Sequence, residues 1–158
     1  MPRTYPCLWF NSQAKEAADF YTSLFPNSQV TTVAHYPEGS GERAGDVLTV
    51  AFELDGAPYV ALNGGPEFTF DEAISITIDC KDQAEIDRYW NALLAHGGAP
   101  EACGWLKDRY GLSWQITPKA LFEMMASPDR AKGKRAAEAM LKMVKLDVAA
   151  LKAAFDGH

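Results

Sequence analysis

The side chains best suited to nucleophilic chemistry are three cysteines, Cys7, Cys80 and Cys103, which lie far apart in the sequence. An odd number without C-x-x-C spacing argues against a disulfide framework and against a zinc knuckle. A thiol becomes reactive when a base or a positive field lowers its pKa. Lys107 and Arg109 follow Cys103 closely, but they fall on alternate strand faces or in a turn. The pattern therefore favours reduced, mostly buried thiols.

Histidine, a common metal ligand and general base, occurs at His35, His96 and His158. No two of them have the H-x-x-x-H or H-x-E spacing that brings ligands or a base onto one helix face. His96 stands beside two glycines at a predicted helix end, where a cation suits the helix dipole. His35 follows a predicted strand next to a loop, so it is the histidine to consider for a functional role.

Other catalytic motifs are not found in the sequence. There is no G-x-S-x-G nucleophile turn. A site for S-adenosylmethionine usually needs a glycine-rich turn between a parallel strand and a helix, followed by an acidic residue. Gly64-Gly65 and Gly97-Gly98 lack that context. The sequence therefore predicts neither a serine hydrolase nor this cofactor site.

The elements that position the polar residues are predicted to form two copies of one unit. Shifting the chain by 70 positions aligns Ser12 with Asp82, and both are residue types that cap helix N-termini. Each is followed by apolar residues at helical spacing. The first predicted helix ends near Pro26, and the second ends at Gly97-Gly98.

Strand-like segments flank both predicted helices in the same order. The predicted strands are 5–10, 28–35, 46–54 and 57–63 in the first copy, and 74–80, 99–103, 104–108 and 112–117 in the second. Asp55-Gly56 indicates a type I′ hairpin turn between two of them. The predicted order is therefore β-α-β-β-β, twice.

After the second copy the pattern becomes helical. Pro118 to Ala126 is predicted as a helix, Ser127 is predicted to cap a further helix that has Pro128 as its first residue and continues to Val144, and Asp147 is predicted to cap the last one. We expect these helices to pack on a sheet edge or on a second subunit. The predicted organisation is one domain over residues 1–158, with a first module at 5–64, a second module at 73–118 and a helical extension at 119–158.

Composition and charge predict a soluble cytoplasmic protein. The chain is 47% hydrophobic and 23% charged, with no apolar run long enough to cross a membrane and no apolar signal-peptide core. A formal net charge of −6 disfavours binding to nucleic acid, whose backbone is also negative. The basic cluster at 130–135 alternates with small residues and indicates a solvated helix face.

Six short motifs, in order and at matching spacing, resemble PhnB-like proteins. They are Cys7-Leu8-Trp9-Phe10-Asn11, Phe20-Tyr21, Leu62-Asn63-Gly64-Gly65, Cys103-Gly104-Trp105-Leu106-Lys107-Asp108, Trp114-Gln115-Ile116 and Met143-Val144-Lys145-Leu146-Asp147. PhnB-like proteins belong to the vicinal oxygen chelate superfamily, with glyoxalase I, bleomycin-resistance proteins and extradiol dioxygenases. The resemblance implies an α+β fold in which two βαβββ modules form a curled mixed sheet around a pocket, usually in a homodimer.

The resemblance also implies where a metal would sit. Active relatives hold a divalent ion with His, Glu or Gln on the first and terminal strands, and the ion acts as a Lewis acid. These positions correspond to Tyr5 and Ser75 on the first strands, and to a residue near Ala61 and Gln115 on the terminal strands. Only Gln115 is a ligand type seen at its position among relatives. We therefore predict no metal site and no cofactor.

Aromatic residues indicate a binding site more strongly. The resemblance places Trp9, Trp105, Tyr110 and Trp114 around the pocket, where aromatic walls suit a planar or apolar ligand. The alternative for each tryptophan is core packing, and Asp108 could simply cap the turn that follows it. The predicted ligand-binding residues are Tyr5, Trp9, Asn63, Ser75, Trp105, Asp108, Trp114 and Gln115.

The family resemblance and the candidate residues lead to three possible functions. The first is a PhnB-like small-molecule-binding protein that acts as a homodimer without a cofactor. The second is a divalent-metal-dependent lyase, isomerase or dioxygenase, whose missing ligands come from substrate, water or the partner subunit. The third is methylation, because PhnB-like proteins often carry the label 3-demethylubiquinone-9 3-methyltransferase.

Overall fold

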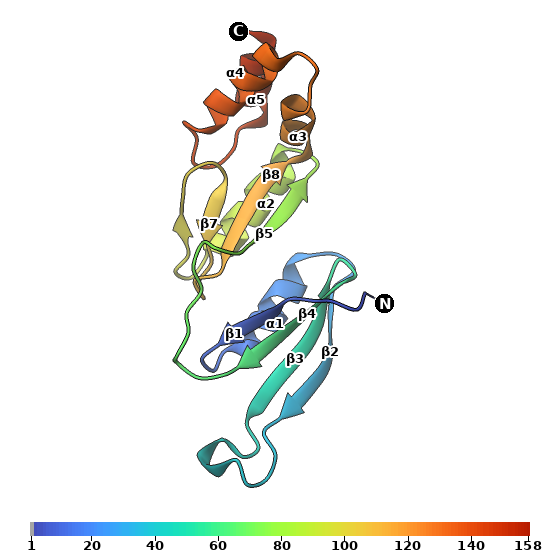
Figure 1. Cartoon of the computed structure of the whole chain (residues 1–158), viewed down its shortest axis with the longest axis vertical. Helices are drawn as coiled ribbons and strands as arrows, with labels where there is room; N and C mark the ends of the chain where they lie inside the picture. Colours follow the sequence, from blue (N-terminus) through green and yellow to red (C-terminus); the bar gives the residue numbers. More distant parts are fainter. Residues whose placement is uncertain (1) are drawn as a thin grey trace. The chain divides into compact units, whose positions relative to one another are not determined.

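The computed structural model describes residues 2–158 as two compact units that divide between Phe70 and Asp71 (Figure 1). Each unit contains one four-stranded mixed sheet and a helix between its first two strands. Unit 1 comprises β1 (Cys7–Phe10), α1 (Ala14–Leu24), β2 (Gln29–His35), the 3₁₀ turn η1 (Gly41–Arg43), β3 (Val47–Leu54) and β4 (Ala57–Asn63). The predicted α+β class with two βαβββ modules is confirmed.

Unit 2 repeats this order and then adds helices. It comprises β5 (Ser75–Cys80), α2 (Gln83–Leu94), β6 (Ala99–Pro100), β7 (Trp105–Lys107), β8 (Ser113–Pro118), α3 (Lys119–Met125), α4 (Arg130–Met140) and α5 (Val148–Asp156). The strands β6 and β7 are shorter than predicted. The turn between them contains Cys103 at φ 61° and Gly104 at φ 82°, and this left-handed backbone ends the strand pairing.

The two sheets have the same topology. Their strand orders are β1-β4-β3-β2 and β5-β8-β7-β6. In each, the first strand runs parallel to the last, and the other pairs are antiparallel. Cys7 pairs with Val60 in unit 1, and Thr77 pairs with Gln115 in unit 2. Since Cys7 and Thr77 are equivalent in the repeat, Val60 is the unit 1 counterpart of Gln115.

Strand alternation divides each sheet into an apolar face and an open face. In unit 1, α1 buries Ala14, Ala17, Ala18 and Tyr21, and the Tyr21 ring lies 6.3 Å from the ring of Phe52 on β3. In unit 2, α2 buries Ile86, Tyr89, Trp90 and Leu93. The apolar strand residues with which α2 forms the unit 2 core are Ile78, Cys80, Leu106, Trp114 and Ile116. The opposite face of each sheet carries the intervening residues.

The start of α1 differs from the prediction. Ser12 is not its N-cap, because the helix begins at Ala14 and the preceding Gln13 makes no side-chain capping bond. Instead the Ala14 N–H donates to Oδ1 of Asn63, at 2.8 Å, from the end of β4. A residue distant in sequence therefore caps this helix. By contrast, Asp82 caps α2 as predicted, accepting from the Glu85 N–H at 2.9 Å.

The start of α4 also corrects the prediction. Ser127 and Pro128 do not begin this helix; Asp129 is its N-cap and accepts from the Lys132 N–H. Ser127 Oγ accepts from the Asp129 N–H at 3.2 Å, so these residues form a turn that precedes the helix. The predicted cap of α5 is confirmed, because Asp147 accepts from the Ala150 N–H at 2.9 Å.

The C-terminal helices pack against each other and onto unit 2. Leu121, Leu146 and Leu151 form a buried cluster among them. The connector between α4 and α5, which we call the clamp segment (residues 141–147), binds the β6–β7 turn through its backbone. The N–H groups of Cys103 and Gly104 donate to the Met143 and Val144 carbonyls, both at 2.8 Å. This pairing explains why α4 ends at Met140 instead of continuing to Val144 as predicted.

Gln83 on α2 holds the other side of the clamp segment. Its Nε2 donates to the Leu146 carbonyl at 3.1 Å, and its Oε1 accepts from the Val148 N–H at 2.8 Å. Lys145 adds an ion pair with Asp87, 2.8 Å apart, and this contact lowers the pKa of Asp87. The clamp segment is therefore attached to the β6–β7 turn on one side and to α2 on the other.

We expect Gln83→Ala to lower the free energy of unfolding by about 1–2 kcal/mol, because one hydrogen bond to the clamp segment and one to the first residue of α5 are lost. Trypsin should then cleave faster at Lys142 and Lys145. Urea denaturation and timed proteolysis measure both effects. Gln29→Ala is the matched control, because Gln29 is exposed and its side chain makes a long hydrogen bond to Glu53, at 3.4 Å, away from the clamp segment. Equal cleavage rates for the two variants would show that Gln83 does not hold the segment.

No helix within residues 2–158 is both long and apolar enough to cross a membrane.

Candidate functional site

The open face of the unit 2 sheet is polar, and we call it the polar face. Its residues, from β5, β8 and β7, are Ser75, Thr77, Asp79, Ser113, Gln115, Thr117, Trp105 and Lys107. Gln115 Nε2 donates to Ser75 Oγ at 2.9 Å. Trp105 pairs directly with Gln115 across the strands and is half-buried. The structure therefore brings together three of the predicted ligand-binding residues, Ser75, Trp105 and Gln115.

Hydrogen bonding on the polar face is incomplete. Ser113, which pairs with Ser75 and with Lys107, is fully buried, and its Oγ has no hydrogen-bond partner in the described part of the chain. A buried hydroxyl left without a partner costs about 1–3 kcal/mol. A ligand group that hydrogen-bonds at this position would recover that free energy.

Lys107 brings little net charge to the polar face, because two carboxylates surround it. It forms ion pairs with Glu72 and, at 3.9 Å, with Glu101. The hydrogen bond with Glu72 raises the pKa of Lys107 and lowers the pKa of Glu72. Both groups lie at the surface, where such pairs contribute little to stability. The polar face therefore suits a neutral ligand better than an anion.

Asp108 and Trp114 lie away from the polar face, in a buried hydrogen-bond network. Asp108 Oδ1 accepts from the backbone N–H groups of Tyr110, at 2.9 Å, and Leu112, at 3.1 Å. Asp108 Oδ2 accepts from the indole N–H of Trp114 at 2.9 Å. Asp108 is 2% exposed, and Trp114 is fully buried on the side that α2 covers. Both residues therefore secure the β7–β8 turn and the core.

The remaining predicted site residues belong to unit 1 and have different contacts. Tyr5 precedes β1 and is 57% exposed. Trp9 Nε1 donates to the Gly65 carbonyl at 2.9 Å, and its ring meets Phe68 edge-on at 4.9 Å. Asn63, besides capping α1, donates to the Val47 carbonyl at 3.1 Å. Trp9 thus packs on the segment after β4, and Asn63 ties β4 to α1 and β3.

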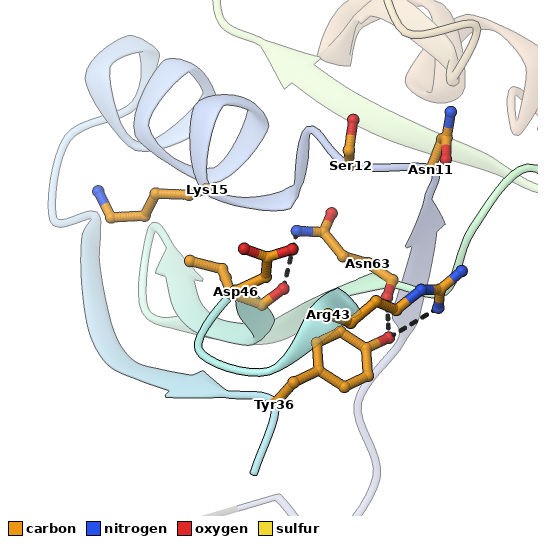
Figure 2. A pocket seen from close by; sticks show the side chains of 8 residues that line it. Asn11, Ser12, Lys15, Tyr36, Arg43, Asp46 and Asn63 are labelled. Atoms are coloured by element: carbon orange, nitrogen blue, oxygen red, sulfur yellow. Dashed lines mark hydrogen bonds between the residues drawn. The ribbon is translucent and has the colours of Figure 1, made fainter. Parts of the chain in front are cut away.

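Unit 1 also contains a pocket of about 350 Å³ that the sequence did not indicate (Figure 2). Its lining residues are Asn11, Ser12, Lys15, Tyr36, Arg43, Asp46, Val47 and Asn63. Tyr36 Oη donates to the Asn63 carbonyl at 2.6 Å and accepts from Arg43 Nη1 at 3.2 Å. Asn11 and Asn63 belong to motifs quoted above, and Asn63 is a predicted ligand-binding residue. Tyr36, Arg43 and Asp46 come from a loop without a motif, so the sequence did not indicate that they join Asn63 in a pocket.

Active relatives hold a metal at four strand positions, and the side chains that this chain has there are poor metal ligands. Ala61 is fully buried on the α1 side, so the terminal-strand position in unit 1 is the apolar Val60. In unit 2, Ser75 and Gln115 are neutral side chains bonded to each other. Among residues 2–158, no group of three or more His, Cys, Asp or Glu side chains is arranged to hold an ion. This donor set is poor for zinc, iron or manganese.

The cysteines and glycine pairs have structural positions. Cys80 is buried, which raises its pKa to about 12, and Cys103 is partly buried. Cys7 is exposed, which corrects the prediction of mostly buried thiols; it lies on the open face of the unit 1 sheet. Gly64-Gly65 follow β4 without starting a helix, and Gly97-Gly98 follow α2. Neither pair is the strand-to-helix turn that S-adenosylmethionine sites use.

Comparison with known proteins identifies the family. Residues 2–117 match the family described as 3-demethylubiquinone-9 3-methyltransferase. A solved structure described as a putative 3-demethylubiquinone-9 3-methyltransferase, PhnB protein, from Bacillus cereus is 32% identical, with a TM-score of 0.67, covering 74% of this chain and 99% of that one. The chain belongs to this PhnB-like family. The family match ends just before α3, so the C-terminal helices lie beyond it.

More distant structures share the fold of this PhnB-like protein. Protein PA1353 from Pseudomonas aeruginosa is 20% identical, with a TM-score of 0.62, over 75% of this chain and 98% of that one. The fosfomycin resistance protein FosX from Listeria monocytogenes is 15% identical, with a TM-score of 0.54, over 77% and 94%. These likenesses confirm the vicinal oxygen chelate fold. No curated protein matches the chain.

Proposed function

We propose that this PhnB-like protein binds a small planar or partly apolar molecule on the polar face of unit 2. Trp105 would stack against the ligand, and Gln115 and Ser75 would anchor its polar groups. The observation that carries this proposal is the Gln115–Ser75 hydrogen bond beside a half-buried tryptophan, on a sheet face that α2 does not cover.

The contacts of the tryptophans support a binding role for Trp105. The indole N–H groups of Trp9 and Trp114 donate to Gly65 and Asp108. Within residues 2–158, neither Trp90 Nε1 nor Trp105 Nε1 has such an acceptor, but Trp90 is buried on α2 whereas Trp105 is half-exposed on the polar face. An amphipathic ring with an unused donor and a half-exposed surface suits ligand recognition. Ser113 Oγ, buried nearby on the same face, provides a second hydrogen-bonding group for the ligand.

We further propose that the protein acts as a cytoplasmic homodimer and needs no cofactor. The homodimer rests on the family resemblance, and the lack of a cofactor rests on the donor set of the polar face. The methyltransferase description of the family finds little support here, because neither glycine pair forms the turn that S-adenosylmethionine requires. Calorimetry with S-adenosylmethionine tests this point, and saturable micromolar binding would restore that function.

Tryptophan fluorescence tests ligand binding directly. A library of quinones and small aromatic acids should contain at least one compound that quenches the emission saturably. We expect Trp105→Phe to abolish most of this quenching and Gln115→Ala to weaken binding about threefold to tenfold, the effect of one neutral hydrogen bond. Trp9→Phe is the matched control and should bind normally, because the Trp9 ring already packs on Phe68 and its indole N–H donates to the Gly65 carbonyl.

Two results would overturn the proposal. One is a full library without saturable quenching, or quenching that Trp105→Phe leaves unchanged. The other is a stoichiometric divalent metal in protein purified without chelators, if it is lost in Gln115→Ala. The second result would favour a metal-dependent lyase, isomerase or dioxygenase.

A further inference from the structure

The pocket in unit 1 contains two opposite charges that form no ion pair within residues 2–158. Arg43 and Asp46 both line it, and neither takes part in an ion pair within residues 2–158. Lys15, the third charged lining residue, is already paired with Asp19 at 2.5 Å. The pocket therefore presents one positive and one negative charge, with no net charge.

The Arg43 guanidinium contacts two residues, Tyr36 and Gly65. Its Nη1 donates to Tyr36 Oη at 3.2 Å, and its Cζ lies 5.7 Å from the centre of the Tyr36 ring. Its Nη2 lies over Gly65, where an added Cβ would be only 2.8 Å away. Gly65 is at φ +103°, a conformation that glycine adopts without strain. Arg43 is an exposed residue, and these contacts with Tyr36 and Gly65 orient its guanidinium toward a carboxylate.

Asp46 is fixed by its backbone and leaves its carboxylate available. Its N–H donates to the Arg43 carbonyl at 2.9 Å, and its own carbonyl accepts from the Tyr36 N–H at 2.8 Å. These bonds close the β2–β3 loop and place both charged residues at one pocket (Figure 2). Glu67 also approaches Gly65, but it does not line the pocket and lies beyond ion-pair distance of Arg43.

We propose that this pocket binds a small zwitterion of the α-amino acid class, with its carboxylate on Arg43 and its ammonium group on Asp46. An anion without a positive group would be repelled by the Asp46 carboxylate, and a cation without a negative group would be repelled by the Arg43 guanidinium. A zwitterion satisfies both charges with charge-assisted hydrogen bonds. The volume of about 350 Å³ is at the small end of ligand pockets, which suits a molecule of this size.

This site is separate from the polar face. All residues that line the pocket belong to unit 1, whereas the polar face is built from β5, β7 and β8 in unit 2. An amide shift in unit 1 and the fluorescence of Trp105 therefore report on the two sites independently. Failure of one proposal leaves the other standing.

Nuclear magnetic resonance of the full-length ¹⁵N-labelled protein tests the zwitterion site. The common α-amino acids are titrated one by one, and the backbone amide shifts of residues 43–47 are followed. We expect saturable shifts with at least one of them. Acetate, methylamine, and the amide and N-acetyl derivatives of the same amino acid should each bind at least tenfold more weakly, because each lacks one of the two charges.

Variants identify the residues responsible. We expect Arg43→Gln and Asp46→Asn each to weaken binding at least tenfold, with unchanged thermal unfolding as a check on the fold. Glu42→Gln is the matched control and should bind normally, because this exposed neighbour does not line the pocket. No saturable shift with any amino acid, acetate binding as tight as the amino acid, or an unchanged affinity in Arg43→Gln would each rule out the zwitterion site.

Discussion

Replacing Asp108 with alanine is expected to lower the free energy of unfolding by about 3–5 kcal/mol, because several buried N–H groups lose their acceptor. One carboxylate serves three donors, the N–H groups of Tyr110 and Leu112 and the indole N–H of Trp114. Asp108 is 2% exposed and Trp114 fully buried, so water cannot readily replace the lost acceptor. Urea denaturation followed by circular dichroism measures the change.

The control for this variant is Asp82→Ala. Asp82 also accepts from a backbone N–H, that of Glu85, but it does so at the exposed start of α2. Loss of such a cap costs about 1 kcal/mol. If Asp108→Ala destabilised the protein no more than Asp82→Ala, the buried network would not be what holds the β7–β8 turn.

This network also bears on the proposed ligand site. Trp114 and Gln115 are neighbours on β8 and therefore point to opposite faces of the sheet. When the Asp108 carboxylate fixes the Trp114 ring inside the core, Gln115 must lie on the polar face. Ligand binding should therefore weaken in Asp108→Ala even though Asp108 itself does not reach that face.

Gly104→Ala is expected to lower the free energy of unfolding by about 3 kcal/mol or more. Gly104 is at φ +82°, where an L side chain is strained by about 1–2 kcal/mol. An added Cβ would also lie 2.9 Å from the Ile116 carbonyl oxygen and 3.0 Å from Leu146 in the clamp segment. A backbone oxygen cannot move aside as a flexible side chain can. Overpacking therefore adds about 1–3 kcal/mol to the loss of stability. Denaturation measures the total, and trypsin cleavage at Lys142 and Lys145 reports release of the clamp segment.

Gly111→Ala separates the two contributions to this cost. Gly111 has a similar backbone conformation, at φ +85°, but no atom lies within 4 Å of the position of an added Cβ. Gly111→Ala should therefore lower the free energy of unfolding only by the backbone strain, about 1–2 kcal/mol. Trypsin should cleave the clamp segment of this variant no faster than that of the unsubstituted protein. Equal costs for the two substitutions would mean that the contact of Gly104 with Ile116 and Leu146 adds nothing.

Gly104 links the C-terminal helices to the polar face. It precedes Trp105, and its N–H donates to the Val144 carbonyl. The clamp segment thus supports the turn from which the Trp105 ring extends. The helices beyond the family match therefore contribute to the position of the residue that we propose as the main ligand contact.

Local patterns in the sequence determined the elements and their faces. On the predicted strand 5–10, Leu8 and Phe10 are two residues apart and are both buried. On the predicted strands 74–80 and 112–117, Ser75 and Gln115 lie together on the open face. The Asp55-Gly56 pair adopts φ 47° and 79°, as the predicted type I′ turn requires. Strand periodicity and turns of this kind depend on neighbouring residues, so they can be read from the chain.

Tertiary structure decided which distant residues meet. Asn63 caps α1 across 49 residues, and Arg43 and Asp46 come together with Asn11 and Lys15 only when the β2–β3 loop folds over the start of that helix. The sequence left open whether Asp108 binds a ligand or caps a turn, and only the structure shows that its buried carboxylate accepts from the turn N–H groups of Tyr110 and Leu112. Such contacts depend on strand register and packing between remote segments, which no short pattern in one chain encodes.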